Sequence, residues 1–327
     1  MTIEHLISDP SYKEKFVLQK LICYFLDYSK EEMRLHASQE LSSEQEQKIL
    51  TTYRDVVDNN KPLEYALGFV EFFKRKFHVD QHTLIPRPET EYMITAVTEE
   101  IDRLQIADGR WQETTCKLQT TDGMQQADTK LGDKGSCNVL LDIGTGCGVL
   151  GISVLLQNPC FFKKAIFTDI SDKALSVAQQ NYEILIRDHD FPVEFIVSDL
   201  LSFLDDARHN ITGCRVILVG NLPYIPEKTF DENVADNVKK REPKMAFVGG
   251  DDWLIYYRNM LDQIIKIADD RQQMAGNWAL SSEFLTLFLE MMTRQTDILR
   301  QEYQDYFVFE DVKTFHFNIR IVKTTLK

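Results

Sequence analysis

The segment 139–151 constrains the fold of this chain more than any other part. An apolar run with the sequence VLLDI breaks into glycines at Gly144, Gly146 and Gly148 and then continues as an apolar stretch. This order predicts a strand, a tight turn and a helix. Glycines let a ligand lie against the backbone, and a helix N-terminus presents unpaired N–H groups. The sequence therefore predicts a ligand-binding turn inside an α/β domain.

Three aspartates lie at related places before and after this turn. Asp142 belongs to the first predicted strand, Asp169 ends the run 165–169, and Asp199 ends the run 193–199. The carboxyl ends of parallel strands meet at one edge of a sheet, so we expect the glycines and the acids to converge on one crevice. Each acid alone is typical of a helix N-cap. Together they favour a ligand site in which Asp169 holds ribose hydroxyls.

A tetrapeptide, Asn221-Leu222-Pro223-Tyr224, follows another strand-like run, 215–220. The Asn221 carboxamide offers an acceptor and a donor at one point, and the Leu222 carbonyl can accept a second hydrogen. Pro223 stiffens the loop, and the Tyr224 ring supplies a flat face for stacking. An ordinary turn is the alternative. The loop indicates methylation of a planar amide or exocyclic nitrogen, which must be oriented toward a methyl donor.

A nicotinamide dehydrogenase is an alternative because residues 146–151 also match the dinucleotide pattern Gly-x-Gly-x-x-Gly. Such an enzyme would likewise use Asp169 to hold a ribose. It leaves Asp199 and the Asn221 loop without a role. The combination therefore favours a methyltransferase.

Further segments resemble the HemK/PrmC family, the S-adenosylmethionine-dependent methyltransferases that modify a glutamine side-chain nitrogen in peptide chain release factors. The similar segments are 63–68, 83–91 with the sequence TLIPRPETE, 139–151, 221–224 and 241–252. The resemblance implies a class I, Rossmann-like α/β fold with a seven-stranded sheet and a small helical N-terminal domain. It also implies S-adenosylmethionine as cofactor and methyl transfer to the glutamine of a Gly-Gly-Gln motif.

The resemblance also implies roles for individual residues. The glycine turn would cradle the methionine moiety, the first acid its ammonium group, the second the ribose and the third the adenine. Cofactor-binding residues are thus expected at Asp142, Gly144, Thr145, Gly146, Cys147, Gly148, Asp169, Ile170, Asp199, Leu200 and Asn221. The catalytic residues would be Asn221, Leu222, Pro223 and Tyr224. Arg87, Glu89 and Thr90 would shape the substrate entrance, although two prolines in this segment can also explain it as a rigid linker.

The catalytic loop departs from the family's usual Asn-Pro-Pro-Tyr, because Leu222 replaces the first proline. The backbone carbonyl survives this change, so the loop remains compatible with activity. Asn-Leu-Pro-Tyr is also similar to the loop of ribosomal RNA adenine dimethyltransferases, which methylate another planar NH2 group. A nucleic-acid amino-methyltransferase and a catalytically silent S-adenosylmethionine-binding module are therefore the alternatives. Leu200 stands where relatives often carry an aromatic residue.

The chain is expected to have two domains. Residues 1–62 should form a helical N-terminal domain, 63–91 a hairpin and inter-domain junction, and 92–327 the methyltransferase domain. The stretch 104–138 lacks an apolar period and predicts a flexible insertion. Apolar residues at helical spacing, including Phe16, predict a bundle core in the first domain, with a platform for a protein substrate as the alternative. Other local expectations are a helix start at 42–47, a hairpin within 65–80 and a closing strand pair over 306–309 and 317–322.

Composition narrows the classes of protein. The 327 residues are 43% hydrophobic and 27% charged, which is typical of a globular protein, and a formal charge of −14 argues against a general nucleic-acid binder. Local basic clusters at 74–76 and 239–241 are expected to be solvated faces. Six scattered cysteines without metal-ligand spacing predict reduced thiols and no structural metal. No apolar run reaches membrane-spanning length, so we expect a cytoplasmic enzyme. We also expect a monomer, and the resemblance implies a release factor as the protein partner.

Overall fold

The computed structural model describes residues 1–107, 113–120, 123–129, 137–186, 191–209, 211, 213–273, 284–314 and 319–327. They form two compact units, each with its own hydrophobic core. One unit comprises Met1–Val70 together with Ala235–Arg241, and the other comprises Glu71–Val234 together with Glu242–Lys327. The helical unit thus takes in a short segment from the second half of the chain.

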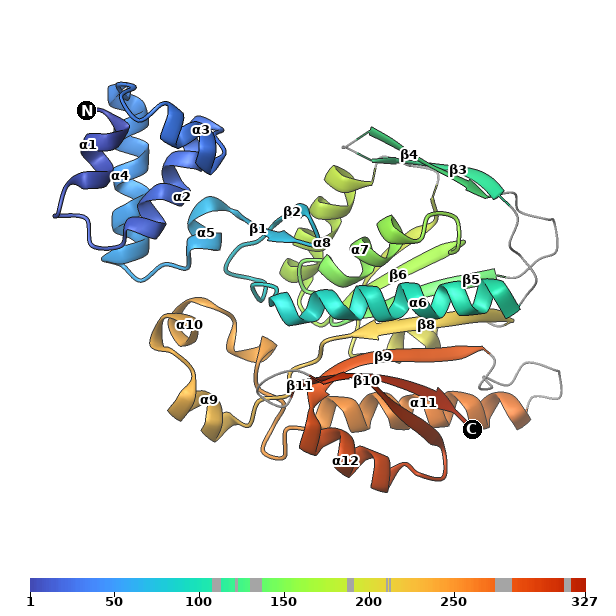
Figure 1. Ribbon diagram of the computed structural model, residues 1–327. Coiled ribbons are helices and arrows are strands. Elements are labelled where there is room, and N and C mark those ends of the chain that lie inside the picture. Colours follow the sequence, from blue (N-terminus) through green and yellow to red (C-terminus); the bar gives the residue numbers. More distant parts are fainter. Residues whose placement is uncertain are drawn as a thin grey trace. The chain divides into compact units, whose positions relative to one another are not determined.

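The first unit is a small helical bundle (Figure 1). Its helices are α1 (Ile3–Ser8), α2 (Lys15–Leu26), α3 (Lys30–Leu35), α4 (Ser43–Val57), α5 (Leu63–Leu67) and α10 (Asp236–Arg241). Ser42 caps α4 by accepting from the Gln45 N–H, and the Gln45 side chain returns to the Ser42 N–H. This reciprocal pair satisfies two donors that a helix start leaves open, and it confirms the predicted helix start.

The core of this bundle is formed by apolar side chains from α1 to α4, among them Leu18, Leu21 and Ile22. Phe16 was expected in that core, but its side chain is 56% exposed. The ammonium groups of Lys20 and Lys30 lie 5.1 and 5.9 Å from the centre of its ring. The prediction is wrong for Phe16 because helical spacing identifies the apolar stripe of α2 but not its exact width.

The chain passes from one unit to the other through a hairpin. Strands β1 (Phe69–Phe72) and β2 (Arg75–His78) pair as a two-stranded sheet, within the predicted range. Phe73 and Lys74 both have positive φ, 46° and 63°, which is the backbone of a two-residue hairpin turn. A short helical turn, η1 (Pro88–Thr90), then leads into α6 (Glu91–Ala107).

The second unit is built on a mixed sheet of seven strands in the order β10-β11-β9-β8-β5-β6-β7. These are β5 (Cys137–Ile143), β6 (Lys164–Asp169), β7 (Val193–Val197), β8 (Cys214–Gly220), β9 (Leu285–Met292), β10 (Phe307–Thr314) and β11 (Ile319–Leu326). Strands β5 to β9 are parallel, whereas β11 is antiparallel to both of its neighbours. The predicted class I α/β fold is confirmed, and so is the closing strand pair.

Helices cover both faces of the sheet (Figure 1). One face carries α6, α7 (Val149–Gln157) and α8 (Asp172–Leu185), and the other carries α11 (Ile255–Gln273) and α12 (Thr293–Glu302). Shorter elements are η2 (Ser202–Asp205), η3 (Ala207–His209), α9 (Glu227–Asn233) and η4 (Lys244–Ala246). Strands β6 and β7 follow β5 on one side, and β8 and β9 then lie on its other side, so the order of strands reverses beside β5. Ligands of such sheets bind at this reversal.

The predicted insertion 104–138 contains regular structure. Residues 104–107 complete α6, and residues 137–138 begin β5. Between them, β3 (Glu113–Thr120) pairs with β4 (Gly123–Thr129) in an antiparallel ladder. The remaining residues, 108–112, 121–122 and 130–136, lie outside the described part of the chain. The flexibility of the segment stays a prediction.

Two cysteines that were expected to be reduced are joined. Cys137 and Cys214 begin neighbouring parallel strands and are directly paired in the ladder, with their Cα atoms 4.5 Å apart. They form a disulfide, so the prediction of reduced thiols is wrong for this pair. The sequence did not indicate this pair because the two cysteines are 77 residues apart, and only the register of the two strands makes them neighbours.

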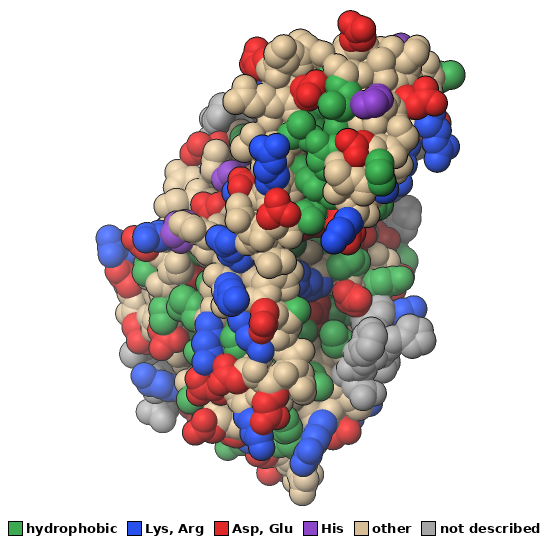
Figure 2. Space-filling view, turned by 90° about the vertical axis from the view of Figure 1, so that its left-hand side faces the viewer, with side chains coloured by type: hydrophobic (Ala, Val, Ile, Leu, Met, Phe, Trp, Pro, Cys, Tyr) green, Lys and Arg blue, Asp and Glu red, His purple; other side chains and the backbone are tan. Residues whose placement is uncertain are grey.

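Charges of both signs are mixed on the face of the molecule drawn in Figure 2, where Lys and Arg side chains alternate with Asp and Glu. None of the helices in the described ranges is long and apolar enough to cross a membrane.

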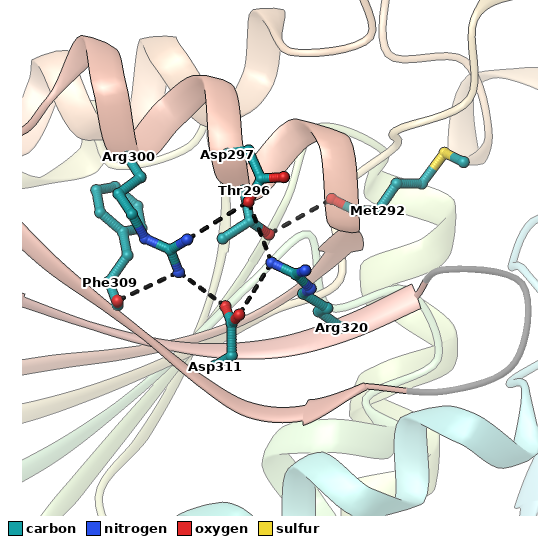
Figure 3. Close-up of polar contacts among 7 residues, drawn as sticks. All are labelled: Met292, Thr296, Asp297, Arg300, Phe309, Asp311 and Arg320. Carbon is teal, nitrogen blue, oxygen red and sulfur yellow. Dashed lines mark hydrogen bonds and ion pairs between the residues drawn. The ribbon is translucent and has the colours of Figure 1, made fainter.

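An ion-pair network fastens α12 to the edge of the sheet (Figure 3). Arg300 donates to Asp311 of β10 at 2.9 Å, and the Arg320 guanidinium of β11 lies 2.9 Å from the same carboxylate. Both arginines also contact Asp297 of α12, at 3.4 and 3.3 Å. Exposed pairs contribute little individually, but a network of this kind fixes β10, β11 and α12 beside β9.

Candidate active site

A cavity of about 170 Å³ opens at the carboxyl ends of β5, β6 and β8, where the strand order reverses. It brings together twelve of the predicted site residues: Thr90, Gly144, Thr145, Gly146, Cys147, Asp169, Ile170, Asp199, Leu200, Asn221, Leu222 and Pro223. None of its other lining residues was predicted as an individual site residue, and among them are His82, Leu84, Pro86, Ser198, Met245 and Tyr256. Asp142, Gly148, Tyr224, Arg87 and Glu89 lie behind or beside the lining.

The glycine turn lies between β5 and α7. Gly144, Gly146 and Gly148 have φ values of 67°, 57° and 81°, which favour glycine. A Cβ atom on Gly146 would meet nothing within 4 Å, so a ligand can approach its backbone. A Cβ atom on Gly148 would lie 2.8 Å from Ile152 and 3.2 Å from Ala178. Gly148 is thus required by helix packing, whereas Gly146 leaves space at the cavity.

Asp142 lies beneath this turn with only 1% of its surface exposed. One carboxylate oxygen accepts from the Thr145 hydroxyl at 2.7 Å and from the Gly151 N–H at 2.8 Å. The other oxygen, Oδ1, is buried and has no hydrogen-bond partner among the residues that the structure describes. Burial raises the pKa of Asp142 to about 6. An unpaired buried carboxylate oxygen is costly, and a cationic group bound at the turn would offset that cost.

Asp169, at the end of β6, forms one wall of the cavity. Its two oxygens accept from the N–H groups of Gly146 and Ser171, each at 2.9 Å. Burial raises the pKa of its carboxyl group. Each carboxylate oxygen has a second acceptor site, so Asp169 can fix the glycine turn and still accept hydroxyl groups from a ligand.

The third acid differs from the first two, because the Asp199 side chain is exposed. Leu200, which follows it, is buried and has a φ of 53°. Ile170 lines the cavity from the other side and is 58% exposed. Exposed apolar surface beside a carboxylate suits a flat heterocycle with polar edges. Cys147 also lines the cavity, but burial raises the pKa of its thiol to about 12, which keeps it unreactive.

The Asn221 loop is held from behind by backbone contacts. Ile225 exchanges hydrogen bonds with Phe247 and Gly249, and the Gln295 side chain donates to the Tyr224 carbonyl at 3.0 Å. The buried Tyr257 hydroxyl contacts the Leu222 carbonyl at 3.0 Å and also the backbone carbonyl of Glu290. A carbonyl oxygen has two lone pairs, so the Leu222 carbonyl retains one for a substrate.

The Leu222 side chain links this loop to the glycine turn. It is 3% exposed, and its Cδ2 atom would lie 3.0 Å from a Cβ atom on Gly144. The residue that replaces the expected proline therefore packs directly against the turn.

Sequence analysis missed Glu290, a carboxylate at the end of β9 with 1% of its surface exposed. It accepts from the Thr90 hydroxyl at 2.8 Å and from the Tyr224 hydroxyl at 3.1 Å. The Asn221 amide nitrogen lies 3.4 Å from the Thr90 oxygen. Burial raises the pKa of both Glu290 and Tyr224. The sequence signal that could have identified Glu290 is its charge, which interrupts the otherwise uncharged, mainly apolar run 285–292.

Arg87 does not line the cavity. Its guanidinium donates to Glu242 at 3.0 Å and lies 5.8 Å from the centre of the Phe247 ring. Glu242 is buried and also accepts from the Ile85 N–H at 3.0 Å. These contacts fasten the segment before α6 to the segment before η4. Both segments contribute residues to the cavity wall.

Comparison with known proteins identifies the family. The Methyltransferase small domain family matches residues 128–267. The chain is 30% identical to the release factor glutamine methyltransferase of Bacillus cereus, over 75% of this chain and 72% of that protein. It is 31% identical to the enzyme of the same name from Lactococcus lactis, over 72% and 70% of the two chains. This chain belongs to the release factor glutamine methyltransferase family.

Among solved structures, the chain is similar to the N-terminal domain of human METTL16 in complex with SAH, with 14% identity and a TM-score of 0.45. That similarity covers 97% of each chain.

The methyl donor of this methyltransferase is S-adenosylmethionine. The residues present fit such a ligand. The unpaired Asp142 oxygen next to the glycine turn suits its ammonium group, and Asp169 in the cavity wall suits its ribose diol. The open space at Gly146 allows a close approach to the backbone.

Proposed function

We propose that the protein transfers a methyl group to the side-chain amide nitrogen of a glutamine in the Gly-Gly-Gln motif of a peptide chain release factor. The observation that carries the proposal is the position of Asn221, whose amide shares one cavity with the glycine turn and Asp169. A planar NH2 group can be held there beside the donor site. Relatives of the same family are named release factor glutamine methyltransferases, which supports the proposal.

The donor side of the cavity binds and orients the cofactor. When bound, S-adenosylmethionine supplies an electrophilic methyl group on a sulfonium. The backbone of Gly144 and Gly146 would hold its methionine moiety, and Asp142 would balance the ammonium charge. Asp169 would accept the ribose hydroxyls, and Asp199 with Leu200 would receive the adenine.

The acceptor side orients the amide. Asn221 and the Leu222 carbonyl accept the two hydrogens of the substrate NH2 group, and Tyr224 supports the loop from behind. Holding both hydrogens turns the nitrogen lone pair toward the donor, which is the main contribution expected for a weakly nucleophilic amide. The proposed mechanism requires no strong general base, since water can take the proton once the nitrogen carries the methyl group. Arg87, Glu89 and Thr90 shape the entrance for the peptide.

The charge of the chain supports a protein substrate over a nucleic acid. The net charge is −14, and the face in Figure 2 intersperses basic with acidic side chains. A nucleic-acid enzyme should present a basic groove.

The test is incubation with radiolabelled S-adenosylmethionine and a purified release factor, followed by peptide mapping. Label should appear on the glutamine of the Gly-Gly-Gln peptide and be absent from a release factor in which that glutamine is alanine. Ribosomal RNA is the parallel substrate. Label on RNA adenine with an unlabelled release factor would reject the proposal, and so would the absence of any transfer.

A further inference from the structure

Glu290 is a buried acid whose place in the reaction the proposed function leaves open. It lies at the end of an apolar strand with 1% of its surface exposed, beneath the Asn221 loop. Leaving a carboxylate in such a place costs stability unless several donors surround it. The donors here include the hydroxyl groups of Thr90 and Tyr224, at 2.8 and 3.1 Å, and the Asn221 side chain is a further hydrogen-bonding neighbour of Glu290.

The direction of these hydrogen bonds follows from the chemistry of each group. Each carboxylate oxygen of Glu290 accepts from a hydroxyl group, so Glu290 takes the single hydroxyl proton of Thr90. The Thr90 oxygen, with its proton committed, can then only accept from Asn221. Accordingly, the atom of Asn221 that lies 3.4 Å from the Thr90 oxygen is the amide nitrogen. The Tyr224 hydroxyl, whose pKa is raised by burial and by Glu290, remains a donor as well.

We propose that Glu290 and Thr90 are positioning residues that fix the orientation of the Asn221 carboxamide, with its NH2 group turned inward and its carbonyl oxygen turned to the substrate. This inference rests on the proposed function. Neither residue needs to touch the transferred methyl group. Without them, the two orientations of a carboxamide differ little in energy, and only one of them accepts a hydrogen from the substrate nitrogen.

The fixed orientation also determines specificity. An outward carbonyl oxygen attracts a substrate that donates N–H, such as the primary amide of glutamine. It repels the carboxylate of glutamate, which has no hydrogen to donate. Sites that hydrogen-bond one partner strongly reject an analogue that lacks the required group. The site is therefore expected to distinguish glutamine from glutamate by hydrogen-bond direction, since the two side chains have nearly the same shape.

The test compares Thr90→Val with Thr90→Ser. Valine keeps the shape of threonine without the hydroxyl, whereas serine keeps the hydroxyl without the methyl group. Thr90→Val should lower kcat for the release factor by about 10-fold or more, with the Kd for S-adenosylhomocysteine changed by less than about two-fold. Thr90→Ser should recover most of that rate. If Thr90 had a purely structural role, the two variants would differ in melting temperature and not in kcat.

A second measurement uses the parent protein and needs neither activity nor a variant that folds. In NMR spectra, the Asn221 side-chain NH2 protons should exchange slowly with water and show nuclear Overhauser contacts to the Thr90 methyl group. Fast exchange without those contacts overturns the proposal, and so does a Thr90→Val enzyme as fast as the parent. If the NMR result holds but the parent does not methylate the release factor, the proposed function fails while the orientation of Asn221 stands.

Discussion

The two sides of the cavity are built in different ways. The donor side, formed by the glycine turn with Asp142, Asp169 and Asp199, presents mainly backbone and one acid for each strand end. The acceptor side, formed by Thr90, Asn221–Tyr224 and Glu290, is a network of side chains that meet from distant parts of the chain. A backbone surface accommodates a ligand common to many enzymes. A side-chain network selects one acceptor group.

Because of this difference, we expect one side to determine cofactor affinity and the other to determine the rate of methyl transfer. Substitutions on the donor side should reduce cofactor affinity, because we propose that those residues hold a ligand that is already bound before the reaction. Substitutions on the acceptor side should reduce the rate, because those residues orient an atom for transfer.

The largest effect is expected from Asp169→Ala on the donor side. It removes the acceptor for two ribose hydroxyls and releases the Gly146 N–H, which now donates to Asp169 at 2.9 Å. The affinity for S-adenosylhomocysteine should fall by on the order of 2–4 kcal/mol. Calorimetry measures this. The matched control is Asp172→Ala, which removes an exposed acid three residues along the chain and should leave the affinity nearly unchanged.

On the acceptor side, Asn221→Ala should lower methyl transfer to a release-factor glutamine by about 10²-fold, the scale of a lost orienting hydrogen-bond pair. Folding should be preserved, because Asn221 is only partly buried. Steady-state kinetics and a thermal melt are the measurements. A melting temperature lowered in proportion to the rate would assign Asn221 to the fold instead.

The donor side should also depend on pH through Asp142. Its pKa is raised to about 6 by burial, so the folded apoprotein binds this proton more tightly than the unfolded chain does. Asp142 therefore makes the apoprotein less stable as pH rises from about 4 to 6. Cofactor affinity should instead rise with pH over this range, since the cofactor ammonium group pairs with the ionised form of Asp142. Affinity should be about 10-fold weaker at pH 5 than at pH 7.

Calorimetric titrations with S-adenosylhomocysteine between pH 5 and 8 measure this trend. Asp142→Asn is the control, and it should bind more weakly with a nearly flat pH profile. An unchanged slope in that variant would assign the titration to another group, such as Asp169.

The smallest effect is expected where the two sides touch. Leu222→Pro restores the family's usual loop, retains the backbone carbonyl and reduces the freedom of the unfolded chain. It should preserve or raise glutamine methylation, by less than about three-fold. The lost packing of a buried side chain against the glycine turn should cost about 1 kcal/mol of stability. A large loss of activity would show that the leucine contact, and not the carbonyl, matters for the loop.

The donor side could be predicted from sequence because its signals are local. The turn requires positive φ at positions 144 and 146, which favours glycine there and makes the turn visible in the sequence. An acid at the end of a parallel strand lies at the edge of the sheet where ligands bind. The strand, turn and helix of this segment indicated an α/β domain, and the family resemblance implied the seven-stranded class I sheet. The Asn221 loop was also recognisable, since its four residues are contiguous.

Other features depend on tertiary register, which local patterns do not carry. Thr90 and Glu290 are 200 residues apart, and nothing near either one indicates that they share a hydrogen bond. Cys137 and Cys214 looked like unrelated thiols until the pairing of β5 with β8 brought them together. Asp142 was expected to hold the cofactor ammonium, but the sequence did not show that it lies behind the cavity lining with one oxygen holding the turn.

The separation of the two sides is the central claim, and single-turnover methyl transfer at saturating S-adenosylmethionine tests it most directly. Asp169→Ala and Asn221→Ala would each be mixed with excess release factor at a donor concentration above the Kd of that variant. The account predicts that Asp169→Ala recovers a rate within about three-fold of the parent, because its defect is in binding. Asn221→Ala should remain about 100-fold slower even when S-adenosylmethionine is saturating. If both variants lose affinity and saturated rate together, the two sides are one cooperative site and the account is contradicted.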